Sequence, residues 1–330
     1  MSVTRRQMLV GAAATLAASP ALSAAPAWGQ DANWPQRSIR IIVPTAPGGS
    51  PDIASRLIGE KISGRLGQSV VVESMTTAGG VAGLQLVAKG APADGYNLAM
   101  LTGGFATQAA VLKNLPYDPI ADFVFITSVV RYPIVYAVPP DSPIKSFKDM
   151  IERAKANPNK VSYGIVGAGT LYHLLGKWID NQAGVEMNAV PYRGTALALQ
   201  DVLGGRVDVL SDAATSTIPR VRSGQMRALA VSSAERYPLL PEVPTMAEVV
   251  PGIKCESWLG LAAAASTPRP IVDRLNGEFR RALELPEVKK WAEDSGVVPA
   301  PSTPEEFRAR VEGDIHRWTD VVVRNNISVQ

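Results

Sequence analysis

Short apolar runs alternate with amphipathic stretches from Trp34 to the end of the chain. Each run is rich in β-branched or aromatic residues, as strands are. Many of the stretches between them place apolar residues at helical spacing. This alternation predicts an α/β fold with largely parallel sheets and helices on both faces. The strand-like runs are IRIIV, SVVVE, YNLAML, FVFITSVV, PIVYAV, KVSYGIV, MNAVPY, RVDVLS, MRALAVS and SWLGLAA.

The starts of several helices are marked by capping residues. Ser50 precedes Pro51, which predicts an N-cap followed by proline at the first helical position. The apolar residues that follow at helical spacing are expected to face the core: Ile53, Leu57, Ile58, Ile62 and Leu66. Hydroxyl residues before other apolar helices are expected to act as caps in the same way: Ser146, Thr170, Thr195 and Thr303.

Two proline-rich breaks, Tyr136–Phe147 and Pro251–Pro270, interrupt the alternation. They predict a middle segment inserted into a domain made from both ends of the chain. The expected first domain comprises residues 34–138 and 257–330, and the inserted second domain comprises residues 139–256. Such an arrangement has two crossings, near residues 137–141 and 254–258, at which the domains could hinge.

The first 30 residues have the pattern of an export signal. Arg5 and Arg6 precede an Ala/Leu-rich run and then small residues, which is typical of a twin-arginine signal, with a general secretory signal as the alternative. Cleavage is expected near residues 24–30. The formal charge of the chain is +3, and the first 30 residues contribute two positive charges and no negative one. The rest of the chain therefore carries about +1, which does not suggest a nucleic-acid surface.

Motifs for catalysis or for cofactors are incomplete. The chain has 2 histidines and 1 cysteine, and it lacks a G-x-S-x-G nucleophile elbow. GAGTLYHLLGKW (Gly167–Trp178) lacks both the third glycine of a dinucleotide fingerprint and the spacing of a phosphate loop. Cys255 lies in a strand-like run and is expected to be structural. We therefore expect no metal and no cofactor.

Glycine-rich or small-residue elbows join strand-like runs to helix-like stretches. In parallel α/β sheets such elbows lie at the carboxyl ends of the strands, where ligands bind. Each helix N-terminus adds unpaired N–H groups and about half a positive charge. Any single elbow could be only a turn that the topology requires, but together they predict a cleft for a small anion. The elbows are Ala46–Asp52, Thr76–Gly83, Leu101–Ala106, Gly167–His173, Tyr192–Leu197 and Ser211–Ser216.

The stretch WPQRSIRIIVPTAPGGSPDIASRLIGEKISGRLGQSVVVES resembles the opening of the tripartite tricarboxylate transporter receptors, also called Bug-type solute-binding proteins. AVPYRGTALALQDVLGGRVDVL and SWLGLAAAASTPRPIVDRLN extend the resemblance over most of the chain. It implies a two-domain periplasmic binding protein of type II with a small carboxylate in the interdomain cleft. The implied ligand is a di- or tricarboxylate, an amino acid or an aromatic acid. The implied partners are the membrane subunits of a secondary transporter, and the receptor is expected to be a monomer without catalytic activity.

The resemblance also implies a set of ligand-binding positions. The carboxylate would dock on the N–H groups of residues 48–50 and 78–80, and the second domain would close over its other end. Two bulky residues, Phe105 and Tyr172, stand beside these elbows; they either pack beneath the loops or line a pocket for an aromatic or bulky acid. The full expected set is Pro47, Gly48, Gly49, Ser50, Asp52, Ala78, Gly79, Gly80, Gly104, Phe105, Gly169, Thr170, Tyr172, His173, Arg193, Gly194, Thr195 and Asp212.

One departure from the family pattern affects this site: Met75 and Thr76 replace a polar and basic pair, which removes a possible carboxylate-facing charge. Two alternatives remain open. An exported α/β enzyme could use Asp52, His173 or Asp212 as an acid or base, although the chain offers no constellation around them. An orphan receptor could instead serve a sensor kinase.

Overall fold

The computed structural model describes residues 33–327. The expected export signal lies outside the described residues. Sheet A has the strand order β2-β1-β3-β9-β4, with β10 on the other edge of β4. β1 is parallel to β2 and β3, whereas β9 is antiparallel to β3 and β4, so the sheet is mixed rather than largely parallel. Its strands are β1 (Ile39–Val43), β2 (Val70–Ser74), β3 (Asn97–Thr102), β4 (Phe123–Val138), β9 (Glu256–Ala264) and β10 (Val298–Pro299).

Sheet B is built around the last part of β4. β7 and β8 pair with it in antiparallel fashion, and β5 is parallel to both β7 and β6. The strands of this sheet are β5 (Ser162–Val166), β6 (Asn188–Tyr192), β7 (Val209–Ala213) and β8 (Arg227–Val231). The α/β class predicted from the alternation is therefore confirmed, with two mixed sheets that share one strand.

The shared strand β4 changes sheets at a proline. Residues 123–133 pair with β9, and residues 134–138 pair with β7 and β8. Pro133 has no N–H to donate, and such a residue is tolerated where a ladder ends. The apolar runs on either side of this position, which look like two strands in the sequence, therefore form one. The first crossing lies at Pro133–Ile134, before the expected range of 137–141.

The chain returns to sheet A at Cys255–Glu256. The N–H of Cys255 donates to the carbonyl of Ser232 at 2.8 Å, and β9 begins at the next residue. This second crossing falls within the range of 254–258 expected from the sequence. The domain boundaries themselves stay a prediction.

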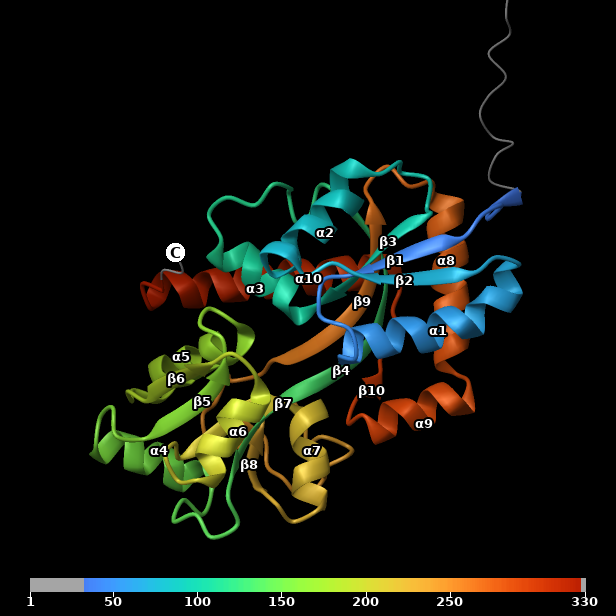
Figure 1. The fold of residues 1–330 in the computed structure, drawn as a ribbon. Helices are drawn as coiled ribbons and strands as arrows, with labels where there is room; N and C mark the ends of the chain where they lie inside the picture. The colour runs from blue at the N-terminus through green and yellow to red at the C-terminus, as the bar shows by residue number, and fades with distance from the viewer. Residues whose placement is uncertain (1–32, 328–330) are drawn as a thin grey trace, which may run out of the picture. The chain divides into compact units, whose positions relative to one another are not determined.

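The helices pack on both sheets, as Figure 1 shows. α1 lies beside α8 on sheet A, and α10 contacts both α3 and β4. The helices are α1 (Ser50–Leu66), α2 (Val81–Gln85), α3 (Gly103–Val111), α4 (Phe147–Ala156), α5 (Leu171–Ala183), α6 (Thr195–Leu203), α7 (Ala214–Arg222), α8 (Arg269–Leu283), α9 (Pro286–Asp294) and α10 (Pro304–Arg324), with the short turns η2 (Thr77–Gly80), η3 (Leu86–Gly90) and η4 (Met246–Glu248). Within the described range, no helix is both long and apolar enough to cross a bilayer.

Some of the expected caps are confirmed. The hydroxyl of Ser146 accepts from the N–H of Asp149 at 3.1 Å at the start of α4. Thr303 and Glu306 form a reciprocal capping box at the start of α10. Thr170 occupies the N-cap position of α5, but its hydroxyl donates to the carbonyls of Val166 and Gly167 instead of accepting from the helix.

Two expectations about helices are wrong. Gly49 and Gly194 occupy the N-cap positions of α1 and α6, so Ser50 and Thr195 are the first helical residues and not caps. Ile53 is 43% exposed, because at about 100° per residue it lies on the side of α1 opposite the face formed by the buried Ala54, Ile58 and Ile62.

The C-terminal helix α10 packs against both halves of the fold. Phe307 contacts the rings of Phe125 and Trp258 edge to face in the core of sheet A. One end of the same helix places Trp318 edge to face against Trp178 of α5. A single helix thus joins the two cores.

Candidate functional site

The candidate site is a cavity of about 550 Å³ between the loops that end the strands of sheets A and B. Five of the six elbows expected from the sequence contribute residues to its wall; the elbow Tyr192–Leu197 does not. Those of the expected residues that lie on the wall are Ser50, Ala78, Gly79, Gly104, Gly169, Thr170 and Tyr172.

Four helices of eight residues or more begin at this wall. α1 and α3 come from the half containing sheet A, and α5 and α7 come from the half containing sheet B. None of the described residues that line the cavity is charged. Helix N-termini offer N–H groups and a partial positive charge, so the wall suits an anion without a lysine or arginine beside it.

The first elbow is closed by Asp52. Its carboxylate accepts from the N–H of Gly48 at 2.9 Å and pairs with Arg56 at 2.9 Å. The hydrogen bond from Arg56 holds the pKa of Asp52 below its usual range, against the effect of burial. The amide of Gly48 is therefore engaged within the loop, and Pro47, Gly48, Gly49 and Asp52 support the wall without lying on it.

The second elbow has an unusual backbone. Ala78, Gly79 and Gly80 are all left-handed, with φ values of 53°, 66° and 91°. A Cβ at Gly80 would lie 2.4 Å from Cβ of Pro44, so this position requires glycine. The side-chain amide of Gln108 on α3 donates to the carbonyl of Gly79 at 2.9 Å. This bond ties the left-handed turn to the start of α3.

Phe105 packs beneath the third elbow. It is 3% exposed and lies in the sheet A core against the rings of Tyr117 and Phe123. It borders a smaller cavity of about 210 Å³, which shares Gly79, Gly104 and Gln108 with the main cavity. The interpretation of Phe105 as a packing residue is thus favoured over a direct role in the main cavity.

The fourth elbow is held by His173. Its Nδ1 accepts from the N–H of Gly169 at 3.1 Å, so the amide of Gly169 is engaged within the loop. Burial lowers the pKa of His173, and the positive charge of Lys177 lowers it further. The imidazole is therefore neutral when it makes this bond, and His173 supports the loop rather than lining the cavity.

Asp212 lies behind the wall. It is 2% exposed; Oδ1 accepts from the N–H of Ala213 at 2.7 Å, whereas Oδ2 has no hydrogen-bond partner among the described residues. Burial raises the pKa of Asp212, and the nearby hydroxyl of Thr195 opposes this shift. The charge of Asp212 also adds to burial in raising the pKa of the cavity residue Tyr172.

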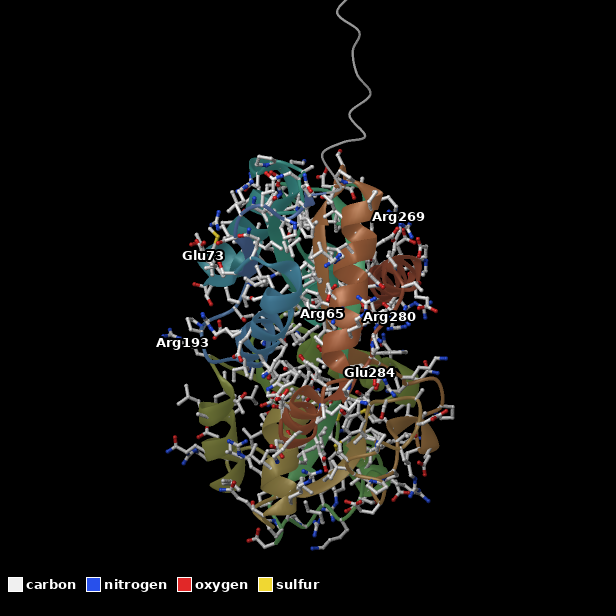
Figure 2. The ribbon with its side chains drawn as sticks, turned by 90° about the vertical axis from the view of Figure 1, so that its right-hand side faces the viewer. Arg65, Glu73, Arg193, Arg269, Arg280 and Glu284 are labelled. Carbon is white, nitrogen blue, oxygen red and sulfur yellow. The ribbon has the colours of Figure 1, made fainter. Side chains whose placement is uncertain are left out.

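The elbow before α6 does not lie on the cavity wall. Arg193 is exposed, and Figure 2 shows its side chain projecting outward at the edge of the molecule. Gly194 and Thr195 do not lie on the wall. The structure therefore places Thr195 beside Asp212 behind the wall, and it keeps Arg193 and Gly194 off the wall.

Sequence reasoning missed several wall residues. Thr45 lies two residues after the end of β1, and Thr102 is the last residue of β3, so the rule that ligands bind at strand ends could have found them. Tyr132 and Ser257 are cross-strand partners near the crossings. No signal in the sequence marks them, because the direction in which the side chains of Tyr132 and Ser257 point depends on how β4 and β9 leave sheet A.

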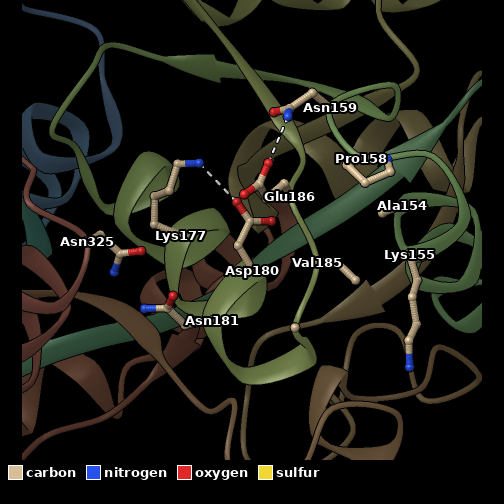
Figure 3. Close-up of a pocket in the computed structure, with 11 residues that line it drawn as sticks. Ala154, Lys155, Pro158, Asn159, Lys177, Asp180, Asn181, Val185, Glu186 and Asn325 are labelled. Atoms are coloured by element: carbon tan, nitrogen blue, oxygen red, sulfur yellow. Dashed lines mark hydrogen bonds and ion pairs between the residues drawn. The ribbon is translucent and has the colours of Figure 1, made fainter.

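A wider pocket of about 700 Å³ lies between α4, α5 and the end of α10. Figure 3 shows two pairs among its polar side chains: Lys177 pairs with Asp180 at 3.0 Å, and Asn159 donates to Glu186 at 2.8 Å. Lys155 points away from both carboxylates. The convergence of helix N-termini favours the cavity between the sheets as the functional site.

Two α/β halves with a cavity at their facing strand ends are the architecture of solute-binding proteins such as the periplasmic transporter protein to which this chain is 37% identical. The match to the tripartite tricarboxylate transporter family receptor covers residues 54–327, so the chain belongs to this family. BugT from Bordetella pertussis is 33% identical, over 88% of this chain and 89% of its own. The R. palustris protein Rpa4515, solved with adipate, has a TM-score of 0.78 and 34% identity and covers 89% of this chain and 99% of its own. MatC from Rhodopseudomonas palustris, solved with bound malate, has a TM-score of 0.74 and 30% identity, with coverages of 88% and 100%.

Proposed function

We propose that this chain is a periplasmic receptor that captures a small carboxylate in the cavity between sheets A and B. It delivers the carboxylate to the membrane subunits of a tripartite tricarboxylate-type transporter, and it performs no catalysis itself. The family consists of substrate-binding receptors, which supports binding over the enzyme alternative.

The observation that carries the proposal is the set of four helix N-termini at a wall without charged side chains. Two helices approach from each half, so a ligand with an anionic group at each end would meet partial positive charge at both. The apolar residues Val111, Leu112 and Leu171 offer contacts for the carbon chain. A short dicarboxylate fits this distribution, and Rpa4515 and MatC were solved with adipate and malate.

The roles of the wall residues follow from their positions. One carboxylate group would bind at the starts of α1 and α3, near Ser50, Gly79 and Gly104. The other would bind at the starts of α5 and α7, near Thr170 and Thr215. Bending at the crossings Pro133–Ile134 and Cys255–Glu256 would let the two halves close on the ligand. Water can bridge the remaining gaps, since the wall offers amides and hydroxyls rather than long side chains.

A thermal-shift panel tests ligand class. Malate, adipate and aromatic acids are compared with adipamide, which keeps the shape of adipate but lacks both charges. A ligand at 100 times its dissociation constant adds about 2.7 kcal/mol to the free energy of unfolding. We expect a dicarboxylate to raise the melting temperature and adipamide to leave it unchanged. Equal shifts with adipate and adipamide, or no shift with any carboxylate, would contradict the proposal.

Two further measurements test the remaining parts of the proposal. NMR of the ligand after prolonged incubation should show it chemically unchanged, whereas conversion would favour the enzyme alternative. Uptake of the labelled ligand by cells should be lost when the receptor gene is deleted. Uptake that continues without the receptor would favour a sensor role instead.

A further inference from the structure

A second cavity, of about 320 Å³, lies behind the strands that separate it from the ligand cavity. Tyr132 and its cross-strand partner Ser257 line the cavity of about 550 Å³ between sheets A and B, which we call the ligand cavity. Their neighbours Arg131 and Glu256 point to the opposite face, because successive side chains of a strand alternate. Glu256 lines the second cavity, which we call the back cavity. Its charged lining residues are Lys254, Glu256, Arg310, Asp314 and Arg317.

Both carboxylates of the back cavity already have cationic partners. Glu256 pairs with Arg131 at 2.5 Å, and this pair joins β9 to β4. Asp314 pairs with Arg317 at 2.6 Å and also accepts from the indole N–H of Trp258 at 2.8 Å. Each acid therefore has its charge matched by a different arginine.

Two cations of the back cavity are left without a carboxylate. In the described part of the chain, neither Lys254 nor Arg310 forms an ion pair within 4.0 Å. Arg310 has one hydrogen bond, a long one of 3.4 Å from its guanidinium to the carbonyl of Glu256. A guanidinium carries five N–H donors, so most of those of Arg310 are open to a further acceptor.

Arg310 is also partly removed from water. Burial lowers its pKa, and the neighbouring charges of Arg131 and Arg317 act in the same direction, whereas Asp314 and Glu256 oppose them. A half-buried cation in a hollow with an excess of positive charge is stabilised by an anion that replaces the lost water. Cys255, which also lines the hollow, adds no charge, since burial raises the pKa of its thiol to about 12.

We propose that the back cavity is a second anion site, which binds a small oxyanion such as sulfate or phosphate between Arg310 and Lys254. Arg310 belongs to α10, and Lys254 directly precedes the second crossing. A bound oxyanion therefore joins the C-terminal helix to the segment that connects the two sheets. The site differs from the ligand cavity in having charged side chains on its wall, and it does not depend on the carboxylate that the ligand cavity holds.

The test compares binding of sulfate by three variants of the full chain. R310Q and K254Q each remove one cation of the back cavity. R280Q is the matched control, because Arg280 is exposed on α8 and lies outside the back cavity (Figure 2). Sulfate is titrated at constant ionic strength against chloride, since surface charges are screened at about 0.1 M salt. Binding is followed by melting temperature and by the side-chain Nε–H resonances of arginine in NMR.

We expect saturable binding to the wild type and to R280Q, and affinity reduced about tenfold or more in R310Q, as the loss of a charge-assisted hydrogen bond predicts. K254Q is expected to weaken binding as well. The side chain of Lys254 is exposed, so we expect this variant to fold like the wild type. One arginine Nε–H resonance should shift with sulfate in the wild type and be missing in R310Q.

A fourth variant separates the two cavities. Y172A alters the wall of the ligand cavity and leaves the back cavity intact. Sulfate binding that persists in Y172A and is lost in R310Q supports the back cavity. Binding that is lost in Y172A and persists in R310Q places sulfate in the ligand cavity and overturns the inference. Equal, non-saturating shifts in all variants also overturn it.

Discussion

His173 accepts a hydrogen bond at Nδ1 from the N–H of Gly169, four residues earlier, at 3.1 Å. The bond closes the loop that carries Gly169, Thr170 and Tyr172 into the wall of the ligand cavity. Nδ1 can accept only while it carries no proton. Protonation of this imidazole therefore removes one of the hydrogen bonds that hold the loop, beside those that Thr170 donates to the carbonyls of Val166 and Gly167.

Acid should weaken ligand binding through His173. Its pKa in the folded protein lies below the ordinary value near 6.5, so the folded state binds fewer protons than the unfolded state between these two values. The contribution of neutral His173 to the stability of the fold is complete above about pH 6.5, and it is lost as the pH falls toward the pKa of the folded state. Calorimetric titrations with a bound dicarboxylate should show affinity falling over that range. H173Q, which can still accept at Oε1, should show a flatter profile; an unchanged slope would contradict the role.

Q108A should weaken ligand binding. The side chain of Gln108 holds the carbonyl of Gly79, which belongs to the left-handed turn on the cavity wall. A single hydrogen bond contributes about 0.5–1.5 kcal/mol, which corresponds to a loss of affinity of about two- to tenfold. Q85A provides the control, because Gln85 is exposed on the neighbouring helix α2 and lies off the wall. Equal affinities of Q108A and Q85A would rule out this positioning role.

G80A and G64A should change stability in opposite directions. At Gly80, φ is 91° and a Cβ would lie 2.4 Å from Cβ and 2.6 Å from the carbonyl oxygen of Pro44, so G80A should destabilise by more than about 2 kcal/mol. Gly64 lies inside α1, and a Cβ there meets nothing within 4 Å. G64A should stabilise by about 0.4–1 kcal/mol. Urea unfolding of both variants measures the two effects, and a tolerated G80A would show that the turn can rearrange.

D52N should be less stable than the wild type at neutral pH and nearly equal to it in acid. The hydrogen bond from Arg56 lowers the pKa of Asp52, so the carboxylate stabilises the fold above its unfolded pKa of about 3.9, and this contribution is lost as the pH falls through the lower folded value. The expected difference near pH 7 is about 1 kcal/mol, since Arg56 is largely exposed. Unfolding midpoints from pH 3 to pH 7 measure it; a constant difference would exclude the titration of Asp52 as the cause.

The sequence alone determined most of the elements and the character of the site. Short apolar runs and period-3.6 apolar patterns are local, so the strands from Ile39–Val43 to Glu256–Ala264 and caps such as Ser146 and Thr303 could be predicted from neighbours in the chain. The same holds for the elbows, because a small-residue turn between a strand and a helix belongs at the carboxyl end of that strand. Five of them do reach the cavity.

Tertiary structure alone decided which atoms of those elbows are available to a ligand. The amides of Gly48 and Gly169 donate to Asp52 and His173, and Gly194 does not lie on the cavity wall. Tyr132 and Ser257 reach the cavity because β4 changes sheets at Pro133, and the same alternation sends Glu256 to a second cavity behind them. The physical reason is that the face of the sheet to which a side chain points depends on how β4 and β9 pair, and these strands are about 120 residues apart in the chain. The local sequence around either strand does not encode the register of such a long-range pair.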